Sequence, residues 1–368
     1  MALFSNHWVK RFEHQYRELT PPEDDAEEVI AGDENPGDFS EEADDEEKVR
    51  VTLSDSEEAD SDDEGEAAGV SQRGKVVSRM ISYISNESLM GKSLKTGELR
   101  KKMKEPVWTV PEPFNVTSFE MEGFSMKMLS SKENPDLDHV ILQLHGGGYM
   151  GSIRNAYYVF AGLYNEVSKG MNVLCPDYRV APENPYPAAL EDAVASYKWL
   201  LTRGYKAENI VVAGDSAGGG LAMALCMYLR DNDLPMPGGL IAMSPWTDLT
   251  ASGASYDENF DKDPLYGGTR ESLIYINAYP GDHDKTDPYI SPAFGSFKDF
   301  PPMLIQVGSN EMLLSDSEVV AAKARDEGVK VRYHVYEGMF HVFQMAYTAI
   351  PESKKAWIEV GKFFEVLF

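Results

Sequence analysis

The sequence predicts an α/β fold with a mostly parallel central sheet that is covered by helices on both faces. From residue 107 onward, short apolar runs rich in β-branched residues alternate with longer helical patterns. These short runs are apolar along their whole length, which is typical of strands buried on both faces. We expect strands at 114–121, 124–130, 140–144, 172–178, 209–214, 239–244, 303–308 and 331–336, and helices at about 155–168, 187–203, 217–231, 315–327 and 353–366.

The N-terminal part of the chain does not follow this alternation. Residues 1–19 place apolar side chains at helical spacing and predict a short helix, which either docks on the body or anchors a partner or membrane surface. Residues 20–69 hold 22 acidic residues against two basic ones and cannot bury enough apolar surface to fold, so we expect disorder. Residues 71–105 carry nine Lys or Arg against three Glu, and their apolar spacing favours an amphipathic helix.

Charge and cysteine content limit the classes of function. Most of the formal charge of −27 comes from the acidic segment 20–69, and no basic patch interleaved with aromatics argues for nucleic-acid binding. Cys175 and Cys226 lie in apolar runs, which indicates core packing in a reducing compartment rather than a disulfide or a metal site. Because no stretch suits a signal peptide or a membrane span, we expect a cytoplasmic protein, and peripheral contact with a lipid surface stays open.

A serine at a strand–turn–helix corner is the strongest chemical signal. The run 209–225, NIVVAGDSAGGGLAMAL, joins a β-branched strand to an apolar helix, and Ser216 lies at the corner between Gly214 and Gly218. This G-x-S-x-G pattern is typical of a nucleophile elbow, where a Cβ on either glycine would collide with the neighbouring strand or helix. A Gly-rich helix start with a capping serine is the structural alternative.

The base is expected downstream of the serine, because hydrolases with this elbow have the chain order Ser, acid, His. Three histidines follow Ser216. His334 lies within an alternating strand and His283 between two aspartates of an irregular region, so we interpret them as structural and solvated, respectively. His341 lies on the loop after the last predicted strand, at the sheet edge where active sites of α/β proteins collect, and we predict that it is the base.

The acid should follow the preceding strand, 303–308. Glu311 comes directly off that strand, whereas Asp316 falls in the first turn of the next helix, where a carboxylate also has a capping role. We therefore predict that Glu311 orients His341, and Asp316 remains the alternative acid.

The strand–helix alternation breaks between residues 247 and 300, a region of Asp, Tyr, Pro and Gly. An insert between two core strands, on the side where the serine emerges, is where a lid would lie. We therefore expect this region to cover the site.

Backbone amides that stabilise a developing oxyanion are predicted from two glycine-rich turns. One donor is Ala217, the residue after the nucleophile, and the other should come from a loop after an earlier strand. The run His145-Gly-Gly-Gly148 has that position, and no P-loop lysine follows it, which makes phosphate binding the weaker interpretation. We expect His145 to fix this loop by hydrogen bonds, and Tyr149 either to line the substrate pocket or to pack in the core.

Together these stretches resemble the hormone-sensitive-lipase-like family of α/β-hydrolases, which includes bacterial family IV esterases and arylacetamide deacetylases. The matching runs are HGGGYMGS, DYRVAPENPYPAALEDA, GDSAGG, DPYISP, VGSNEMLLSDS and YEGMFHVF. The resemblance implies an α/β-hydrolase domain over 107–368, with a cap built from an N-terminal segment, 70–106, and an insert at about 247–285. The acidic segment 20–69 has no counterpart in the family pattern.

The resemblance also implies roles for particular residues. Ser216 is similar to the family's nucleophile and His341 to its base. Gly147, Gly148 and Ala217 fall where the family's oxyanion donors lie.

The acid departs from the family pattern. Many members have Asp-Pro-Leu-x-Asp where this chain has Glu311-Met-Leu-Leu-Ser315. Glu311 precedes His341 by 30 residues, as the aspartate would, and some members use glutamate there.

We therefore expect a serine carboxylic-ester hydrolase, of the carboxylesterase or lipase-like kind, that uses a Ser-His-Glu triad and the HGGG oxyanion loop. Its expected substrate is a small-molecule or lipid ester, and no metal or cofactor is expected. The alternatives are a deacetylase that acts on amides or acetyl esters with the same triad, and a non-catalytic ligand-binding protein of this fold. A scaffold whose acidic segment binds a basic protein partner is a further class.

Overall fold

The computed structural model describes residues 70–84, 108–347 and 349–368. The helix expected in 1–19, the disorder expected in 20–69 and the segment 85–106 therefore lie outside the described residues.

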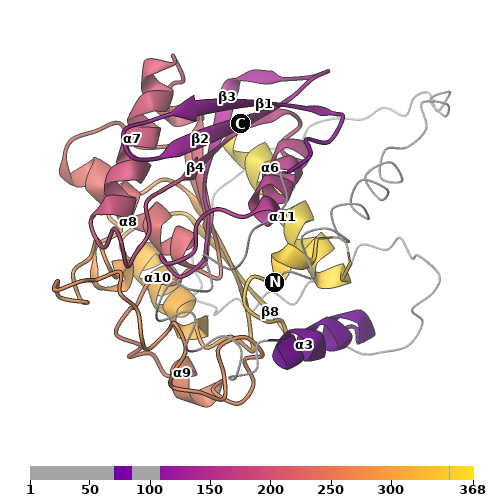
Figure 1. The fold of residues 1–368 in the computed structure, drawn as a ribbon, viewed down its shortest axis with the longest axis vertical. Coiled ribbons are helices and arrows are strands. Elements are labelled where there is room, and N and C mark those ends of the chain that lie inside the picture. The colour runs from indigo at the N-terminus through magenta and orange to yellow at the C-terminus, as the bar shows by residue number, and fades with distance from the viewer. Residues whose placement is uncertain (1–69, 85–107, 348) are drawn as a thin grey trace, which may run out of the picture. The chain divides into compact units, whose positions relative to one another are not determined.

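A sheet of eight strands, in the order β1-β2-β4-β3-β5-β6-β7-β8, organises the described residues (Figure 1). β2 runs antiparallel to both of its neighbours, β1 and β4, and every other neighbouring pair is parallel. The strands are β1 (Phe114–Glu120), β2 (Ser125–Ser131), β3 (Asp136–Leu144), β4 (Met171–Asp177), β5 (Ile210–Asp215), β6 (Gly239–Met243), β7 (Met303–Gly308) and β8 (Val331–Tyr336).

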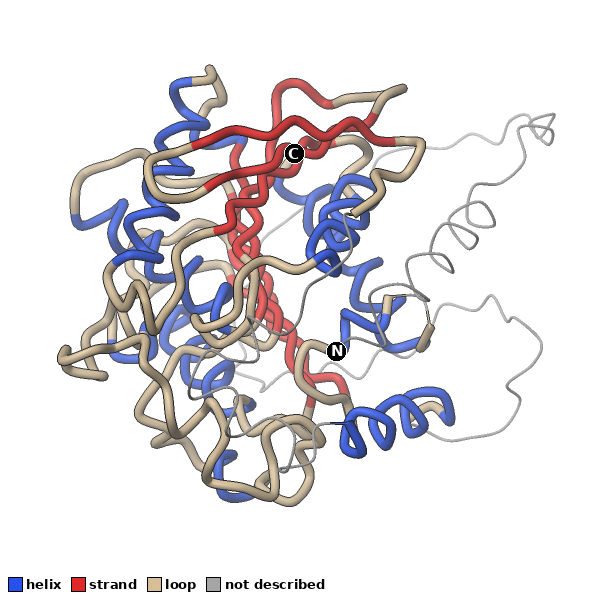
Figure 2. The backbone as a smooth tube through the Cα atoms, in the orientation of Figure 1, coloured by secondary structure: helices blue, strands red, loops and turns tan. Residues whose placement is uncertain are grey.

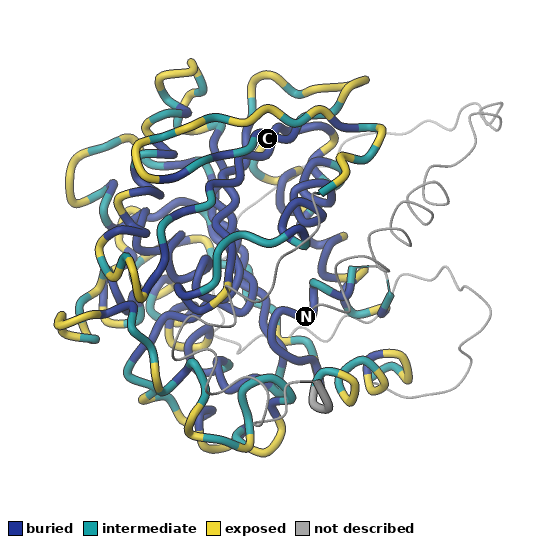
Figure 3. The backbone as a smooth tube through the Cα atoms, in the orientation of Figure 1, coloured by how far each residue is buried: buried dark blue, intermediate teal, exposed yellow. Residues whose placement is uncertain are grey.

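The central strands are apolar throughout because both of their faces are covered. In β3 the successive residues Val140, Ile141 and Leu142 are each 0% exposed. Successive side chains of a strand point to opposite faces, so all of them can be buried only where layers cover both sides. Figure 3 shows this burial as a dark-blue core that follows the sheet.

Helices form the two covering layers. In Figures 1 and 2, α6 (Asn155–Val167) and α11 (Pro351–Leu367) lie on one side of the sheet, and α7 (Ala188–Thr202), α8 (Ala217–Asp231) and α10 (Leu314–Asp326) lie on the other. α8 follows the central strand β5 and is buried along most of its length, which explains its nearly continuous apolar sequence. This arrangement confirms the predicted fold class.

One boundary differs clearly from its prediction. β3 begins at Asp136, four residues before the expected start, and its first residues, DLDH, carry no apolar run. Leu137 in this stretch is 73% exposed. The beginning of β3 therefore extends beyond the buried part of the sheet, where hydrophobic patterning gives no signal.

The region between β6 and β7 contains little regular structure. Over 247–300, all of which is described, the helical elements are α9 (Ser255–Glu258) and a 3-10 turn at Pro292–Phe294. The Asn277 side-chain amide donates to the carbonyl of Gly148 over 2.8 Å, and the carboxylate of Asp263 accepts from the amide of Met312 over 2.8 Å. These contacts join the insert to loops at the carboxyl edge of the sheet. Its action as a cap stays a prediction.

A helix also forms in the basic segment, where apolar spacing predicts one. This helix, α3, spans Gln72–Ile84. Ser71 begins it by accepting a hydrogen bond from the amide of Gly74 over 2.9 Å, and the Ser71 hydroxyl donates to Glu352 of α11 over 3.0 Å. Ile81 packs against an apolar cluster that includes Met339. That this segment forms part of a cap stays a prediction.

Two expectations from composition concern the core and the membrane. Cys175 and Cys226 are buried free thiols, as their apolar sequence surroundings predict. Within the described ranges, every helix is too short or too polar to cross a membrane.

Candidate active site

Ser216 lies at the turn between the central strand β5 and α8, and it is 4% exposed. Its backbone has φ 53° and ψ −125°, a strained conformation for a residue with a Cβ. The turn closes this tightly because of the glycines on either side. A Cβ at Gly214 would lie 2.2 Å from the carbonyl oxygen of Gly218, and a Cβ at Gly218 would lie 2.1 Å from that of Leu144.

Gly218→Ala is expected to lower the free energy of unfolding by about 3 kcal/mol, because the backbone of β3 must move to admit the methyl group. Equilibrium denaturation in urea measures this loss. Gly162→Ala is the matched control, since its Cβ would meet Phe114 at an ordinary 3.4 Å. Equal stability of the two variants would contradict the close approach at Gly218.

Two further side chains complete a hydrogen-bonded row with Ser216. The imidazole Nε2 of His341 lies 2.9 Å from Ser216 Oγ, and its Nδ1 lies 2.8 Å from Glu311 Oε2. His341 comes from the loop after β8 and Glu311 from the loop after β7, so the carboxyl ends of parallel strands bring the three together. With Nδ1 protonated toward Glu311, Nε2 is free to accept a proton from the serine.

The charge around His341 favours its protonated form. Burial lowers the pKa of His341, but the hydrogen bond and charge of Glu311 outweigh this effect, with help from the charges of Asp263 and Asp215. The pKa of His341 therefore lies above its usual value of 6.5. An imidazolium formed by proton transfer from Ser216 would be stabilised in the same way.

Glu311 is itself held by two donors. Its Oε1 accepts from the hydroxyl of Ser244 over 2.7 Å and from the amide of Gly308 over 2.5 Å. The hydroxyl of Ser244 in turn accepts from the amide of Val342, next to His341, over 3.0 Å. Ser244, at the end of β6, therefore joins the loops that carry the acid and the base.

Asp316, the alternative acid, lies elsewhere. It occupies the first turn of α10, as predicted, and its Oδ2 accepts from the amides of Thr247 and Asp248 over 2.7 and 2.8 Å. Its Oδ1 accepts from the hydroxyl of Tyr256 over 2.8 Å. Burial is the largest of the effects that raise the pKa of Asp316 to about 7. These contacts hold the chain after β6 rather than the imidazole.

The other candidate histidines are also apart from Ser216. His334 on β8 forms an ion pair with Glu359, and His283 is exposed in the insert. His145 is buried with its ring stacked on Tyr178, at 4.0 Å between centroids, and its Nδ1 lies 2.7 Å from the carbonyl oxygen of Gly146. Burial lowers the pKa of His145 to about 4, so it is neutral and fixes the glycine loop, as expected.

The glycine loop lies against the elbow. Gly218 packs on the carbonyl groups of Leu144 and His145, where the loop begins. Gly147 and Gly148 have φ 117° and 64°, values that favour glycine. Within the described part of the chain, the amides of Gly147, Gly148 and Ala217 have no hydrogen-bond acceptor, which leaves them available to a ligand.

Asp215, which precedes Ser216, connects the elbow to the glycine loop. The buried carboxylate accepts from the amide of Gly146 over 3.2 Å and from the hydroxyl of Tyr157 over 3.2 Å. Burial is the main cause that raises the pKa of Asp215 to about 7. The bond to Gly146 links the glycine loop directly to the end of β5, next to Ser216.

Tyr149 is 1% exposed and stacks on Tyr279, with 3.8 Å between ring centroids and 5° between ring planes. Its ring therefore packs in the core, one of the two expected arrangements, and contact with a substrate stays a prediction.

Sequence reasoning did not single out three residues of this neighbourhood. Asp215 is the last residue of the buried strand β5, and Ser244 directly follows the buried strand β6; these positions at the sheet edge could have drawn attention to both residues. Tyr266 lies in the irregular insert, yet its ring centroid is 5.0 Å from that of His341. No periodic pattern in the insert points to it.

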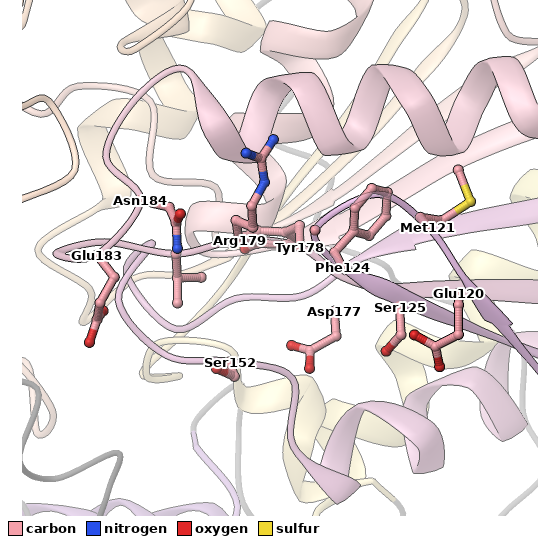
Figure 4. Close-up of a pocket in the computed structure, with 12 residues that line it drawn as sticks. Glu120, Met121, Phe124, Ser125, Ser152, Asp177, Tyr178, Arg179, Glu183 and Asn184 are labelled. Atoms are coloured by element: carbon pink, nitrogen blue, oxygen red, sulfur yellow. The ribbon is translucent and has the colours of Figure 1, made fainter.

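A separate surface pocket of 690 Å³ is lined in part by Ser152, a few residues after the glycine loop, and by the end of β4 (Figure 4). Asp177 and Glu183 are among its lining residues, and none of the predicted site residues is. The guanidinium of Arg179 points away from these carboxylates and binds Asp192 of α7. This hollow is therefore distinct from the site around Ser216.

Comparisons with known proteins agree with the fold. A model of the α/β hydrolase fold matches residues 141–345. Over 225 residues the chain is 38% identical to an acetyl-hydrolase of Streptomyces hygroscopicus, which covers 61% of this chain and 74% of that protein. The solved structure of EstE5, soaked with p-nitrophenyl butyrate, has a TM-score of 0.73 and 34% identity over 81% of this chain and 99% of that one. An esterase from the bacterial hormone-sensitive lipase family has a TM-score of 0.71 and 30% identity over 81% of this chain and 98% of that one.

The chain belongs to the α/β hydrolase fold family. Its likeness to an esterase of the hormone-sensitive lipase family confirms the resemblance drawn from the sequence motifs. The prediction that the chain is an enzyme of the hydrolase class is confirmed with it.

Proposed function

We propose that this chain is a serine carboxylic-ester hydrolase in which Ser216 is the nucleophile, His341 the general base and Glu311 the acid that orients the base. The observation that carries the proposal is the row of hydrogen bonds from Glu311 through His341 to Ser216, at 2.8 and 2.9 Å. A serine hydroxyl becomes a nucleophile when a neutral imidazole accepts its proton. Relatives named acetyl-hydrolase and esterase support the same reaction class.

In the acylation step, Ser216 Oγ forms a bond to the ester carbonyl carbon while its proton passes to His341 Nε2. The carbonyl π electrons move to oxygen, and the amides of Gly147, Gly148 and Ala217 donate hydrogen bonds to that oxyanion. Each such donor contributes on the order of 10²–10³ in rate in measured cases. The electron pair on the oxyanion then re-forms the carbonyl as the bond to the alkoxy oxygen breaks, and the leaving alkoxide takes the proton from His341.

In the deacylation step, water repeats the sequence. It gives a proton to His341 Nε2 and attacks the acyl carbon, and Ser216 leaves with the proton returned. Glu311 stays ionised throughout and stabilises the imidazolium in both steps. The short hydrogen bonds that Glu311 accepts from Ser244 and Gly308 support this role, because they fix the carboxylate beside Nδ1 of His341.

The proposal is tested by hydrolysis of p-nitrophenyl esters from acetate to palmitate, before and after treatment with a fluorophosphonate, which phosphonylates active serines and releases fluoride. We expect turnover that the reagent abolishes, with one adduct mapped to Ser216 by peptide mass spectrometry. A rate maximum at short acyl chains indicates an esterase, and a maximum at long chains a lipase. A wild-type rate no higher than that of the treated protein would support the ligand-binding alternative.

A second candidate is removal of acetyl groups from esters or amides with the same residues. The 38% identity to an acetyl-hydrolase supports it. A strong preference for p-nitrophenyl acetate over the butyrate, together with turnover of an N-acetyl arylamine, would favour this activity.

The pH dependence of kcat/KM should report His341. Only neutral His341 can accept the serine proton, and its pKa is raised above 6.5. Activity should therefore fall as the pH decreases through that raised pKa, with its half-maximum above pH 6.5. Rates on p-nitrophenyl acetate from about pH 5 to about pH 9 measure the acidic limb. A midpoint well below 6.5 would contradict the charge balance described around His341.

A further inference from the structure

Tyr266 of the insert is anchored next to the acid loop. The buried carboxylate of Asp263 accepts from the amides of Leu265 and Tyr266 over 2.8 and 3.0 Å. Its other oxygen accepts from the amide of Met312, the neighbour of Glu311, over 2.8 Å. The backbone at Tyr266 is thus fixed relative to the residues that surround His341.

The side chain of Tyr266 reaches the reacting groups. Its ring packs against the imidazole of His341, with 5.0 Å between centroids and 60° between planes, and its phenol lies close enough to Ser216 to interact with it. Because Ser216 donates its own proton to the neutral His341, the phenol can act toward Ser216 only as a donor. Burial, and after it the charge of Asp263, raises the pKa of Tyr266, so the phenol stays protonated and remains a donor.

This donor lies where the leaving group of an ester would be. As Ser216 Oγ bonds to the carbonyl carbon, the alkoxy oxygen must approach His341 Nε2 to receive its proton. The phenol lies beside both Ser216 and the imidazole, so the same approach brings the alkoxy oxygen near it. Negative charge develops on that oxygen as its bond to carbon breaks, and a fixed donor stabilises it.

We propose that Tyr266 is a further catalytic residue, whose phenol donates a hydrogen bond to the alkoxy oxygen of the ester as the alcohol leaves. This proposal rests on the proposed function of Ser216 and His341. The phenol keeps its proton: the proton that the alkoxide gains comes from His341 Nε2, and the electron pair of the broken C–O bond stays on oxygen. The phenol favours substrates that need this help, namely esters of weakly acidic alcohols.

The test compares Tyr266→Phe with the wild type on two butyrates that give the same acyl-enzyme. Ethoxide is a poor leaving group and p-nitrophenolate a good one. A variant that has lost stabilisation of the leaving group should therefore lose more kcat/KM on ethyl butyrate than on p-nitrophenyl butyrate. Loss of the hydroxyl is expected to reduce kcat/KM on ethyl butyrate by about 10²-fold, in the range measured for a single donor. On p-nitrophenyl butyrate the loss should be several-fold smaller.

Tyr275→Phe is the matched control. It also removes a phenol hydroxyl from the insert, but this hydroxyl binds Arg270 rather than the reacting groups. It should change neither rate. Across a series of aryl butyrates, kcat/KM should depend more steeply on the pKa of the leaving group in Tyr266→Phe than in the wild type or Tyr275→Phe. A purely structural role of Tyr266 would not change this dependence.

Equal losses on both butyrates, or no loss, would overturn the role of Tyr266 while leaving the proposed function intact. Failure of the proposed function looks different, since the wild type itself would then hydrolyse neither butyrate above the rate of the fluorophosphonate-treated protein.

Discussion

Ser216→Ala is expected to lower kcat by about 10⁶-fold, the loss measured when the nucleophile is removed from another Ser-His-acid triad. His341 and Glu311 remain in place in this variant, but His341 has no hydroxyl to activate. The residual rate would come from the free amides of the glycine loop and the elbow, which still polarise a bound carbonyl. Hydrolysis of p-nitrophenyl butyrate, measured at high enzyme concentration for the variant, gives both rates.

The matched control is another buried serine. Ser196 on α7 is 0% exposed, and its hydroxyl donates to the carbonyl of Asp192 over 2.7 Å. Ser196→Ala removes an oxygen from the core but none from the site, so it should retain the wild-type kcat. A Ser216→Ala variant that is folded and as active as Ser196→Ala would reject Ser216 as the nucleophile.

Glu311→Gln should have the second largest effect, a fall in kcat of about 10⁴-fold, as measured when an amide replaces the acid of a serine protease triad. The amide can donate to Nδ1 of His341, which leaves the proton on Nε2 and prevents that nitrogen from accepting one. Loss of the negative charge also removes the main cause that raises the pKa of His341. The acidic limb of the residual activity should therefore move to lower pH.

Asp316→Asn separates the two candidate acids. Asp316 accepts two backbone amides and a tyrosine hydroxyl, so its replacement should cost about 1–3 kcal/mol of stability. It should leave kcat near the wild-type value at temperatures where the variant is folded. Thermal denaturation and rates on p-nitrophenyl butyrate test both parts. A large loss of kcat in Asp316→Asn with little loss in Glu311→Gln would make Asp316 the acid.

The fold could be predicted well because its signals are local. In a parallel sheet covered on both faces, each central strand is a continuous apolar run, and such a run can be located without knowing its neighbours. The start of β3 shows the limit. Its first four residues lie at the edge of the buried region, where three polar side chains and the exposed Leu137 follow no hydrophobic pattern. Only pairing with β4 marks this part of the strand.

The candidate site could be predicted as far as it follows the strand ends. Ser216, Glu311 and His341 each follow a core strand, and parallel strands bring those ends to one edge. Ser244 also directly follows a strand, but its role depends on contacts with two residues that are 67 and 98 positions away in sequence, and no motif indicates them.

Tyr266 was beyond sequence reasoning for a related reason. Its position depends on Asp263, whose bond to Met312 spans 49 residues from an insert without regular structure. Irregular chain has no hydrophobic period from which the direction of a side chain can be read. Only the folded insert shows that this tyrosine packs against the imidazole.

The attachment of the insert has a consequence for engineering the enzyme. Ser216, His341, Glu311 and the glycine loop all follow strands of the sheet, whereas Tyr266 comes from a segment that meets those loops through Asp263 and Asn277. A foreign segment grafted between β6 and β7 should therefore keep the row of Ser216, His341 and Glu311 but lose the phenol of Tyr266, which would alter the choice of substrate. To seat correctly, it must offer a carboxylate to the amide of Met312 and a donor to the carbonyl of Gly148.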